Sequence, residues 1–147
     1  MLFYIETGKK PYGTPDSGMV LMYKLLVVED ETHQRDLYAV ELLGEGYGID
    51  TASNGREALE KIKMHDYDLI IMDIRMPEMD GVETLGKINS KAKKIPVIIY
   101  TSYSHYKSNF LTWTADAYLT KSSDLTELKE KINDILKSKS DLKPVYH

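Results

Sequence analysis

The sequence predicts an α/β fold, a doubly wound three-layer sandwich in which helices cover both faces of a five-stranded parallel sheet. Between residues 24 and 138, short apolar runs alternate five times with amphipathic stretches. The apolar runs are too short for helices and suit strands that are buried on both faces. The amphipathic stretches repeat apolar residues every three or four positions, which is the spacing of one helix face. Strict alternation of strand and helix implies parallel strands joined by right-handed crossovers.

The apolar runs predict the strands in order. The first, Leu25 to Val28, is continuous and ends in two acids, whereas the second is weaker. The third ends in Asp73, and the fourth has Pro96 near its start, where a missing backbone donor is tolerated. Strands are expected at residues 25–28, 47–52, 68–73, 95–100 and 115–120.

The amphipathic stretches predict the helices. Asn54 and Asp124 are capping residue types at the start of the second and the last of them. Helices are expected at residues 31–43, from 54, at 81–89, at 103–113 and from 124. Their apolar sides are expected to carry Leu37, Val40 and Leu43; Ala58, Leu59 and Ile62; Val82, Leu85 and Ile88; and Leu125, Leu128, Ile132, Ile135 and Leu136.

The 147 residues suit one domain. Residues 1–22 mix glycine and proline without periodicity and are expected to be a flexible leader or tag-like segment. Residues 23–138 carry the regular pattern, and residues 139–147 are expected to be a C-terminal tail or truncated linker.

The composition excludes several classes of protein. The chain has no cysteine, which excludes zinc ribbons, thiol catalysis and disulfide scaffolds and fits a reducing compartment. The net charge of -4 disfavours direct binding of nucleic acid. No apolar run approaches the roughly 20 residues of a membrane span, and the amino terminus lacks the pattern of a signal peptide. We therefore expect a cytoplasmic domain that contacts neither nucleic acid nor membrane directly.

Polar residues stand where the predicted strands end. Glu29 and Asp30 follow the first strand, Asp73 ends the third, Thr101 follows the fourth and Lys121 the fifth. One acid at a strand end is usually a cap or a solvated residue, but in doubly wound sheets the functional crevice lies at this edge. Three crowded carboxylates raise one another's pKa unless a cation lies among them, and Mg²⁺ is the hard ion that suits such a site.

Four blocks of sequence carry a family resemblance. LLVVEDE, DLIIMDIRMPEMDG, PVIIYTS and ADAYLTK, in this order, resemble the receiver-domain signature of bacterial response regulators, of the chemotaxis-Y-like kind. The likeness extends from about Tyr23 to about Ser138. It implies the flavodoxin-like receiver topology with strand order 2-1-3-4-5.

The resemblance implies that Asp73 is the phosphoacceptor. Asp30 would bind Mg²⁺ directly, with Glu29 alongside it, and Asp73 and the backbone carbonyl of Arg75 would complete the protein ligands. Thr101 and Lys121 would contact the phosphoryl group.

The same resemblance implies a two-state switch and the partners that it serves. Thr101 would move toward the phosphoryl group, and Tyr118 would turn inward. The donor would be a sensor histidine kinase or a histidine phosphotransfer protein. The output would be an effector protein or a homodimer through the Tyr103–Trp113 helix, the fifth strand and the last helix. The chain would be a phosphoacceptor signalling domain and not an enzyme, catalysing only its own phosphotransfer and dephosphorylation.

Three residues depart from the family pattern. Ser122 stands where a proline joined by a cis bond is usual, and a non-proline cis bond costs about 3–4 kcal/mol, so this loop is either strained or trans. This departure puts the reach of the Lys121 amine in question. Thr114 replaces a common glycine, and Ser102 a common alanine.

Two other functions are compatible with parts of this pattern. A degenerate receiver would act by protein contact without phosphorylation. A small α/β enzyme or cofactor module is disfavoured, because the acids after the first strand would repel a flavin phosphate. In addition, Arg75 stands where an aspartyl-phosphate phosphatase has its second acid.

Overall fold

The computed structural model describes residues 10–12, 20–76, 80–90, 94–102 and 114–141. The strands are β1 (Lys10–Tyr12), β2 (Val20–Met22), β3 (Lys24–Val28), β4 (Gly48–Ala52), β5 (Leu69–Met72), β6 (Val97–Thr101) and β7 (Ala117–Thr120). The helices are α2 (Thr32–Gly44), α3 (Gly55–Met64), α4 (Gly81–Asn89) and α5 (Thr126–Asp141). The predicted helix at Tyr103–Trp113 lies outside the described residues.

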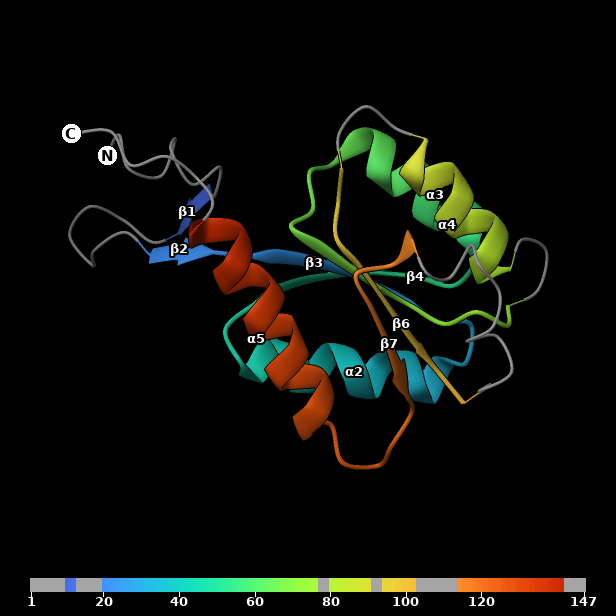
Figure 1. Ribbon diagram of the computed structural model, residues 1–147. Helices are drawn as coiled ribbons and strands as arrows, with labels where there is room; N and C mark the ends of the chain where they lie inside the picture. Colours follow the sequence, from blue (N-terminus) through green and yellow to red (C-terminus); the bar gives the residue numbers. More distant parts are fainter. Residues whose placement is uncertain (1–9, 13–19, 77–79, 91–93, 103–113, 142–147) are drawn as a thin grey trace.

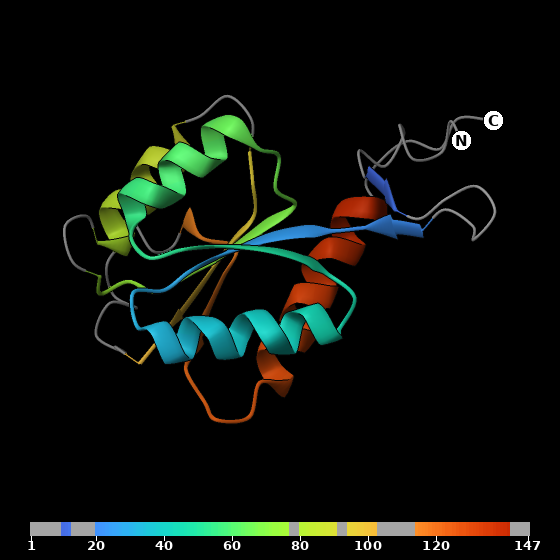
Figure 2. The same cartoon turned by 180° about the vertical axis from the view of Figure 1, so that it is seen from behind.

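A parallel sheet of five strands forms the centre of the molecule. Its strand order is β4-β3-β5-β6-β7, and every neighbouring pair is parallel. Counted from β3, this is the predicted order 2-1-3-4-5. Helices α2 and α5 cover one face of the sheet, and α3 and α4 cover the other (Figures 1 and 2). The α/β three-layer prediction is therefore confirmed.

The core lies in two layers because successive strand residues point to opposite faces of the sheet. In β3, Leu25 and Val27 pack toward α2 and α5, whereas Leu26 and Val28 pack toward α3 and α4. All four residues of β3 from Leu25 to Val28 are at most 1% exposed. This two-sided burial explains why the strand is a continuous apolar run without alternation.

The structure corrects the predicted buried face of α2. Leu37, Val40 and Leu43 are 47%, 67% and 54% exposed, whereas Tyr38 and Leu42 are buried. Tyr38 and Leu42 are four residues apart and so share one side of the helix. The Tyr38 ring packs edge-on against Tyr100 of β6, with 5.5 Å between centroids. The helix thus buries the side that carries the large Tyr38 ring and leaves the opposite side, with three aliphatic side chains, exposed to solvent.

The starts of α3 and α5 agree with the capping residues predicted from the sequence. Asn54 is the N-cap of α3, and its side chain accepts a hydrogen bond of 2.8 Å from the backbone N–H of Glu57. Asp124 precedes α5, and its carboxylate accepts a 2.9 Å bond from the backbone N–H of Thr126. Each carboxylate or amide oxygen pairs a backbone donor that the helix itself leaves unpaired.

A short antiparallel ribbon precedes the sheet. Strands β1 and β2 pair with Lys10 opposite Met22 and Tyr12 opposite Val20, separately from the five-stranded sheet. The sequence pattern did not predict this ribbon. Within the described residues, no helix combines the length and apolar character that crossing a membrane would require.

Candidate functional site

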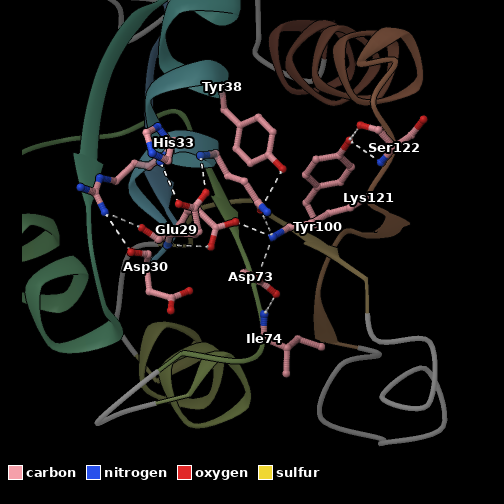
Figure 3. A network of polar contacts seen from close by, with 12 residues as sticks. Glu29, Asp30, His33, Tyr38, Asp73, Ile74, Tyr100, Lys121 and Ser122 are labelled. Atoms are coloured by element: carbon pink, nitrogen blue, oxygen red, sulfur yellow. Dashed lines mark hydrogen bonds and ion pairs between the residues drawn. The ribbon is translucent and has the colours of Figure 1, made fainter.

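Asp73 lies at the carboxyl end of β5, in the middle of the sheet, and is 7% exposed. Its backbone N–H donates to Val28 O at 3.1 Å, which continues the pairing of β5 with β3 by one residue. Its side-chain Oδ1 accepts a 2.7 Å bond from the N–H of Ile74. Backbone and side chain are therefore both held, with Oδ2 directed at Lys121 (Figure 3).

Gly81 fixes the path of the chain beyond Asp73. Its N–H donates to Ile74 O at 2.6 Å. A Cβ on Gly81 would lie 2.4 Å from Asp73 O and 2.6 Å from the Cα of Ile74, distances that no side chain tolerates. Glycine thus lets the first residue of α4 pack directly on the backbone of the site.

Glu29 and Asp30 reach the same edge from β3. Glu29 is 2% exposed, and its N–H donates to Ala52 O at 3.0 Å. The Arg35 side chain donates from Nη1 to Glu29 O at 3.0 Å, which fixes the turn into α2. One carboxylate oxygen each of Glu29, Asp30 and Asp73 can be chosen so that all three lie within 4.8 Å of one another.

Lys121 joins these carboxylates. Its Nζ donates to Asp73 Oδ2 at 2.7 Å, to Gln34 Oε1 at 2.6 Å and, over a short contact, to Glu29 Oε1. Three partners match the three protons of an ammonium. Burial alone would lower the Lys121 pKa, but the bonds to Asp73 and Glu29 outweigh it and hold that pKa above its usual value. Lys121 is therefore a fixed positive charge beside Asp73.

The Glu29 carboxylate has a raised proton affinity. Burial raises its pKa to about 7, although Lys121 opposes the shift, and the negative charge of Asp73 adds to it. Removal of a carboxylate from water disfavours its charged form. The site thus gains from any additional positive charge.

The donor set fits Mg²⁺. Carboxylate oxygens are its preferred protein ligands, and it needs only a few of them because it retains bound water. Glu29, Asp30 and Asp73 are the residues that would hold the ion. Within the described residues they are the only such cluster, and it contains no histidine.

Thr101 and Tyr118 lie on neighbouring strands. Thr101 is buried at the end of β6 and pairs with Thr120 of β7, while Tyr118 pairs with Ile99. Tyr118 packs against the core on the α3 and α4 side, where Ile99 also lies. Because Thr101 is two residues after Ile99, its side chain points to that same side. Arg75 lies two residues beyond Asp73 with its side chain exposed.

The Lys121–Ser122 loop reaches the site without a cis bond. No peptide bond in the described residues is cis, so Lys121–Ser122 is trans, and the Lys121 amine still contacts Asp73. The structure thus removes the question about the reach of Lys121. Thr114, the second departure, is exposed and accepts a 2.6 Å bond from the Asn89 amide.

Sequence reasoning missed three residues around Lys121, namely Gln34, Tyr38 and Tyr100. Gln34 bonds the ammonium, Tyr38 donates to Gln34 Oε1 at 3.4 Å, and Tyr100 bonds Ser122. Gln34 stands one helical turn after Asp30, which is the one available signal. The two tyrosines lie in mainly apolar stretches, so their sequence context indicates buried rings and gives no sign that their hydroxyls contact the site.

Comparisons with known proteins agree with this geometry. The family model described as response regulator receiver domain matches residues 25–133. Response regulator ArlR of Staphylococcus aureus is 37% identical over 118 residues, which cover 79% of this chain and 53% of ArlR. The chain thus spans about half the length of these curated relatives.

Solved structures give the same result. Response regulator TrrA of Thermotoga maritima, in a complex with Mg²⁺ and BeF, has a TM-score of 0.75 and 48% identity, covering 78% of this chain and 99% of that one. A CheY-like receiver domain protein of Methanospirillum hungatei has a TM-score of 0.77 and 30% identity, covering 82% and 98%. This chain belongs to the response regulator receiver domain family.

Proposed function

We propose that the chain accepts a phosphoryl group on Asp73, with Mg²⁺, from a histidine kinase or histidine phosphotransfer protein. The observation that carries the proposal is the 2.7 Å contact between Lys121 Nζ and Asp73 Oδ2, beside three carboxylates within 4.8 Å. A buried acceptor, a fixed cation and a cation-binding carboxylate cluster are the parts that phosphoryl transfer requires.

The proposed transfer is in line. A carboxylate oxygen of Asp73 attacks the phosphorus of a phosphohistidine; the new P–O bond forms as the P–N bond breaks, and the imidazole nitrogen keeps the electron pair. Lys121 and Thr101 contact the phosphoryl oxygens, and positioning and charge neutralisation dominate the rate. Mg²⁺, when bound by Glu29, Asp30, Asp73 and the Arg75 carbonyl, would neutralise charge that develops on those oxygens. Water later cleaves the acyl phosphate. The chain is therefore a signalling domain that catalyses only its own phosphorylation and dephosphorylation.

A histidine kinase partner is supported by a relative. A structure exists of the histidine kinase ThkA in complex with TrrA, and the matched chain is 49% identical to this one with a TM-score of 0.74. A kinase that delivers its phosphohistidine to Asp73 must cover the crevice, and α2 begins two residues after Asp30. The exposed side chains of Leu37, Val40 and Leu43 are an apolar surface of the kind that partner proteins cover. We therefore assign them to the kinase contact.

The proposed response is a two-state change. Thr101 moves toward the phosphoryl group, and Tyr118, on the same side of the neighbouring strand, fills the vacated space. The output surface is the Tyr103–Trp113 segment with β7 and α5, where an effector or a second copy binds.

We further propose residues 23–138 as the receiver domain, 1–22 as a leader, 139–147 as a tail or linker, and a cytoplasmic location without nucleic acid or membrane contact.

Beryllofluoride, which mimics a phosphoryl group on a carboxylate, tests the proposal. With Mg²⁺ it should shift the amide NMR signals of β6, β7 and the site in the wild type. Asp73→Asn, which keeps the side-chain shape, should show no such shifts. An unchanged wild-type spectrum, or equal shifts in Asp73→Asn, would favour the degenerate receiver that acts by contact alone.

A further inference from the structure

Tyr100 grips the residue that follows Lys121. It lies in β6, is 3% exposed, and its hydroxyl reaches the loop after β7 (Figure 3). That hydroxyl accepts a 3.1 Å bond from the N–H of Ser122 and donates a 3.2 Å bond to the carbonyl oxygen of Ser122. One hydroxyl thus engages both backbone groups of a single residue.

These two hydrogen bonds fix the Lys121 backbone on its carboxyl side, and a third bond fixes it on its amino side. On its amino side, the Lys121 N–H donates to Thr101 O at 2.9 Å, which extends the pairing of β6 and β7. On its carboxyl side, Ser122 is tied to Tyr100. Lysine has a long, flexible stem, so a fixed backbone removes much of the freedom that its amine would otherwise have. A proline at 122 would have no N–H to offer the hydroxyl.

The Tyr100 ring is itself held in place. It packs edge-on against Tyr38, with 5.5 Å between centroids and 68° between ring planes. Tyr38 donates to Gln34 Oε1, which also accepts from Lys121 Nζ at 2.6 Å. The Lys121 amine is therefore linked through Gln34 to Tyr38, and the Lys121 backbone is linked through Ser122 to Tyr100.

We propose that Tyr100 is a positioning residue: through its bonds to Ser122 it sets where Lys121 Nζ lies relative to a phosphoryl group on Asp73. The hydroxyl and the Ser122 N–H together do the work that a rigid proline would do at that position. The proposal rests on the proposed function, since it assigns Lys121 to the phosphoryl group.

Tyr100→Phe tests it, because the change removes the hydroxyl and keeps the ring. Beryllofluoride affinity at saturating Mg²⁺ should fall about threefold to tenfold, the range expected for a hydrogen bond. Mg²⁺ affinity without beryllofluoride should not fall, because the carboxylates that would hold the ion are untouched, whereas a general loss of structure would lower it. Tyr67→Phe is the matched control, because it removes a hydroxyl whose partner, at 2.7 Å, is Asp50 of β4, a residue with no proposed role in the site. It should leave both affinities as in the wild type.

Substitutions of Ser122 supply the second arm. Ser122→Ala keeps both backbone groups and should bind beryllofluoride as the wild type does. Ser122→Pro removes the N–H that the hydroxyl accepts and supplies a rigid ring instead, so Tyr100→Phe should weaken beryllofluoride binding less in the Ser122→Pro background than in the wild type. Wild-type affinity in Tyr100→Phe, or an equal loss of Mg²⁺ affinity, would overturn the proposal.

Hydrogen exchange separates this proposal from the proposed function. If the wild type binds no beryllofluoride, phosphorylation is the idea that fails. The grip is then judged in the free protein, where exchange of the Ser122 amide should be about tenfold faster in Tyr100→Phe, on the scale of one lost hydrogen bond. Unchanged exchange would show that Tyr100 does not hold Ser122.

Discussion

Gly81 packs so closely on Asp73 that a Cβ at position 81 would lie 2.4 Å from the Asp73 carbonyl oxygen. The contact joins the start of α4 to the end of β5, so the backbone of Asp73, the proposed phosphoacceptor, and the helix behind it form one unit. Its consequence is that the smallest possible enlargement of residue 81 must displace either α4 or Asp73.

We expect Gly81→Ala to lower the free energy of unfolding by about 1–3 kcal/mol, the usual cost of overpacking. The measurement is urea unfolding followed by far-UV circular dichroism. Gly86→Ala is the control in the same helix, because a Cβ there meets nothing within 4 Å. It should stabilise by up to about 1 kcal/mol, the propensity difference between alanine and glycine in a helix. Equal effects of the two changes would mean that the contact with Asp73 is not tight.

We expect Lys121→Met to raise Mg²⁺ affinity several-fold while beryllofluoride binding is lost. The ammonium occupies Glu29 and Asp73, two of the proposed ligands, so its removal frees them for the ion. Isothermal titration calorimetry measures both affinities. Lys129→Met removes a surface ion pair with Glu41 and should change neither. A drop in Mg²⁺ affinity in Lys121→Met would show that the ammonium does not compete with the ion for Glu29 and Asp73.

The raised pKa of Glu29 predicts a pH effect in the metal-free protein. Between pH 4.5, its ordinary value, and about 7, the folded state binds more protons at Glu29 than the unfolded state does. The Glu29 contribution to stability is therefore full at low pH and is lost as pH rises through this window. Urea unfolding at a series of pH values should show that Glu29→Gln removes this part of the slope. An identical pH profile in the two proteins would place the Glu29 pKa at its ordinary value.

The exposed face of α2 predicts a separation between two phosphoryl donors. Val40→Glu should slow transfer from a cognate histidine kinase at least tenfold, because a charge in an apolar contact is costly to bury. Labelling by the small donor phosphoramidate, which needs no docking, should stay as in the wild type. Met64→Glu is the control, since Met64 is 78% exposed on α3 at the opposite face. Equal slowing by both changes would place the kinase elsewhere.

The strand ends could be predicted from the sequence because each buried strand is a continuous apolar run that stops at a polar residue. That pattern places Glu29 and Asp73 at one edge, the alternation of strands and helices adds Lys121 after the less buried β7, and the structure brings these side chains into contact. The same reasoning was wrong for α2, where the aliphatic residues Leu37, Val40 and Leu43 were preferred over Tyr38. A tyrosine buries its ring and keeps a polar end, so an apolar count undervalues it.

The residues that support Lys121 could not be predicted for a related reason. Tyr100 occupies an apolar strand position, and nothing local indicates that its hydroxyl meets Ser122, which is 22 residues later in the chain. Gln34 likewise meets Lys121 across 87 residues of sequence. Such contacts depend on the strand order and on side-chain direction, which periodicity does not supply.

We propose Asp73 as the phosphoacceptor, and this assignment can be tested directly. Its most direct measurement is incubation with phosphoramidate and Mg²⁺, followed by intact mass and peptide mapping at low temperature. We expect one phosphoryl adduct, located on Asp73 and absent both from Asp73→Asn and from wild type treated with a chelator. An adduct on another residue, or none in the wild type while its fold is intact, would contradict it.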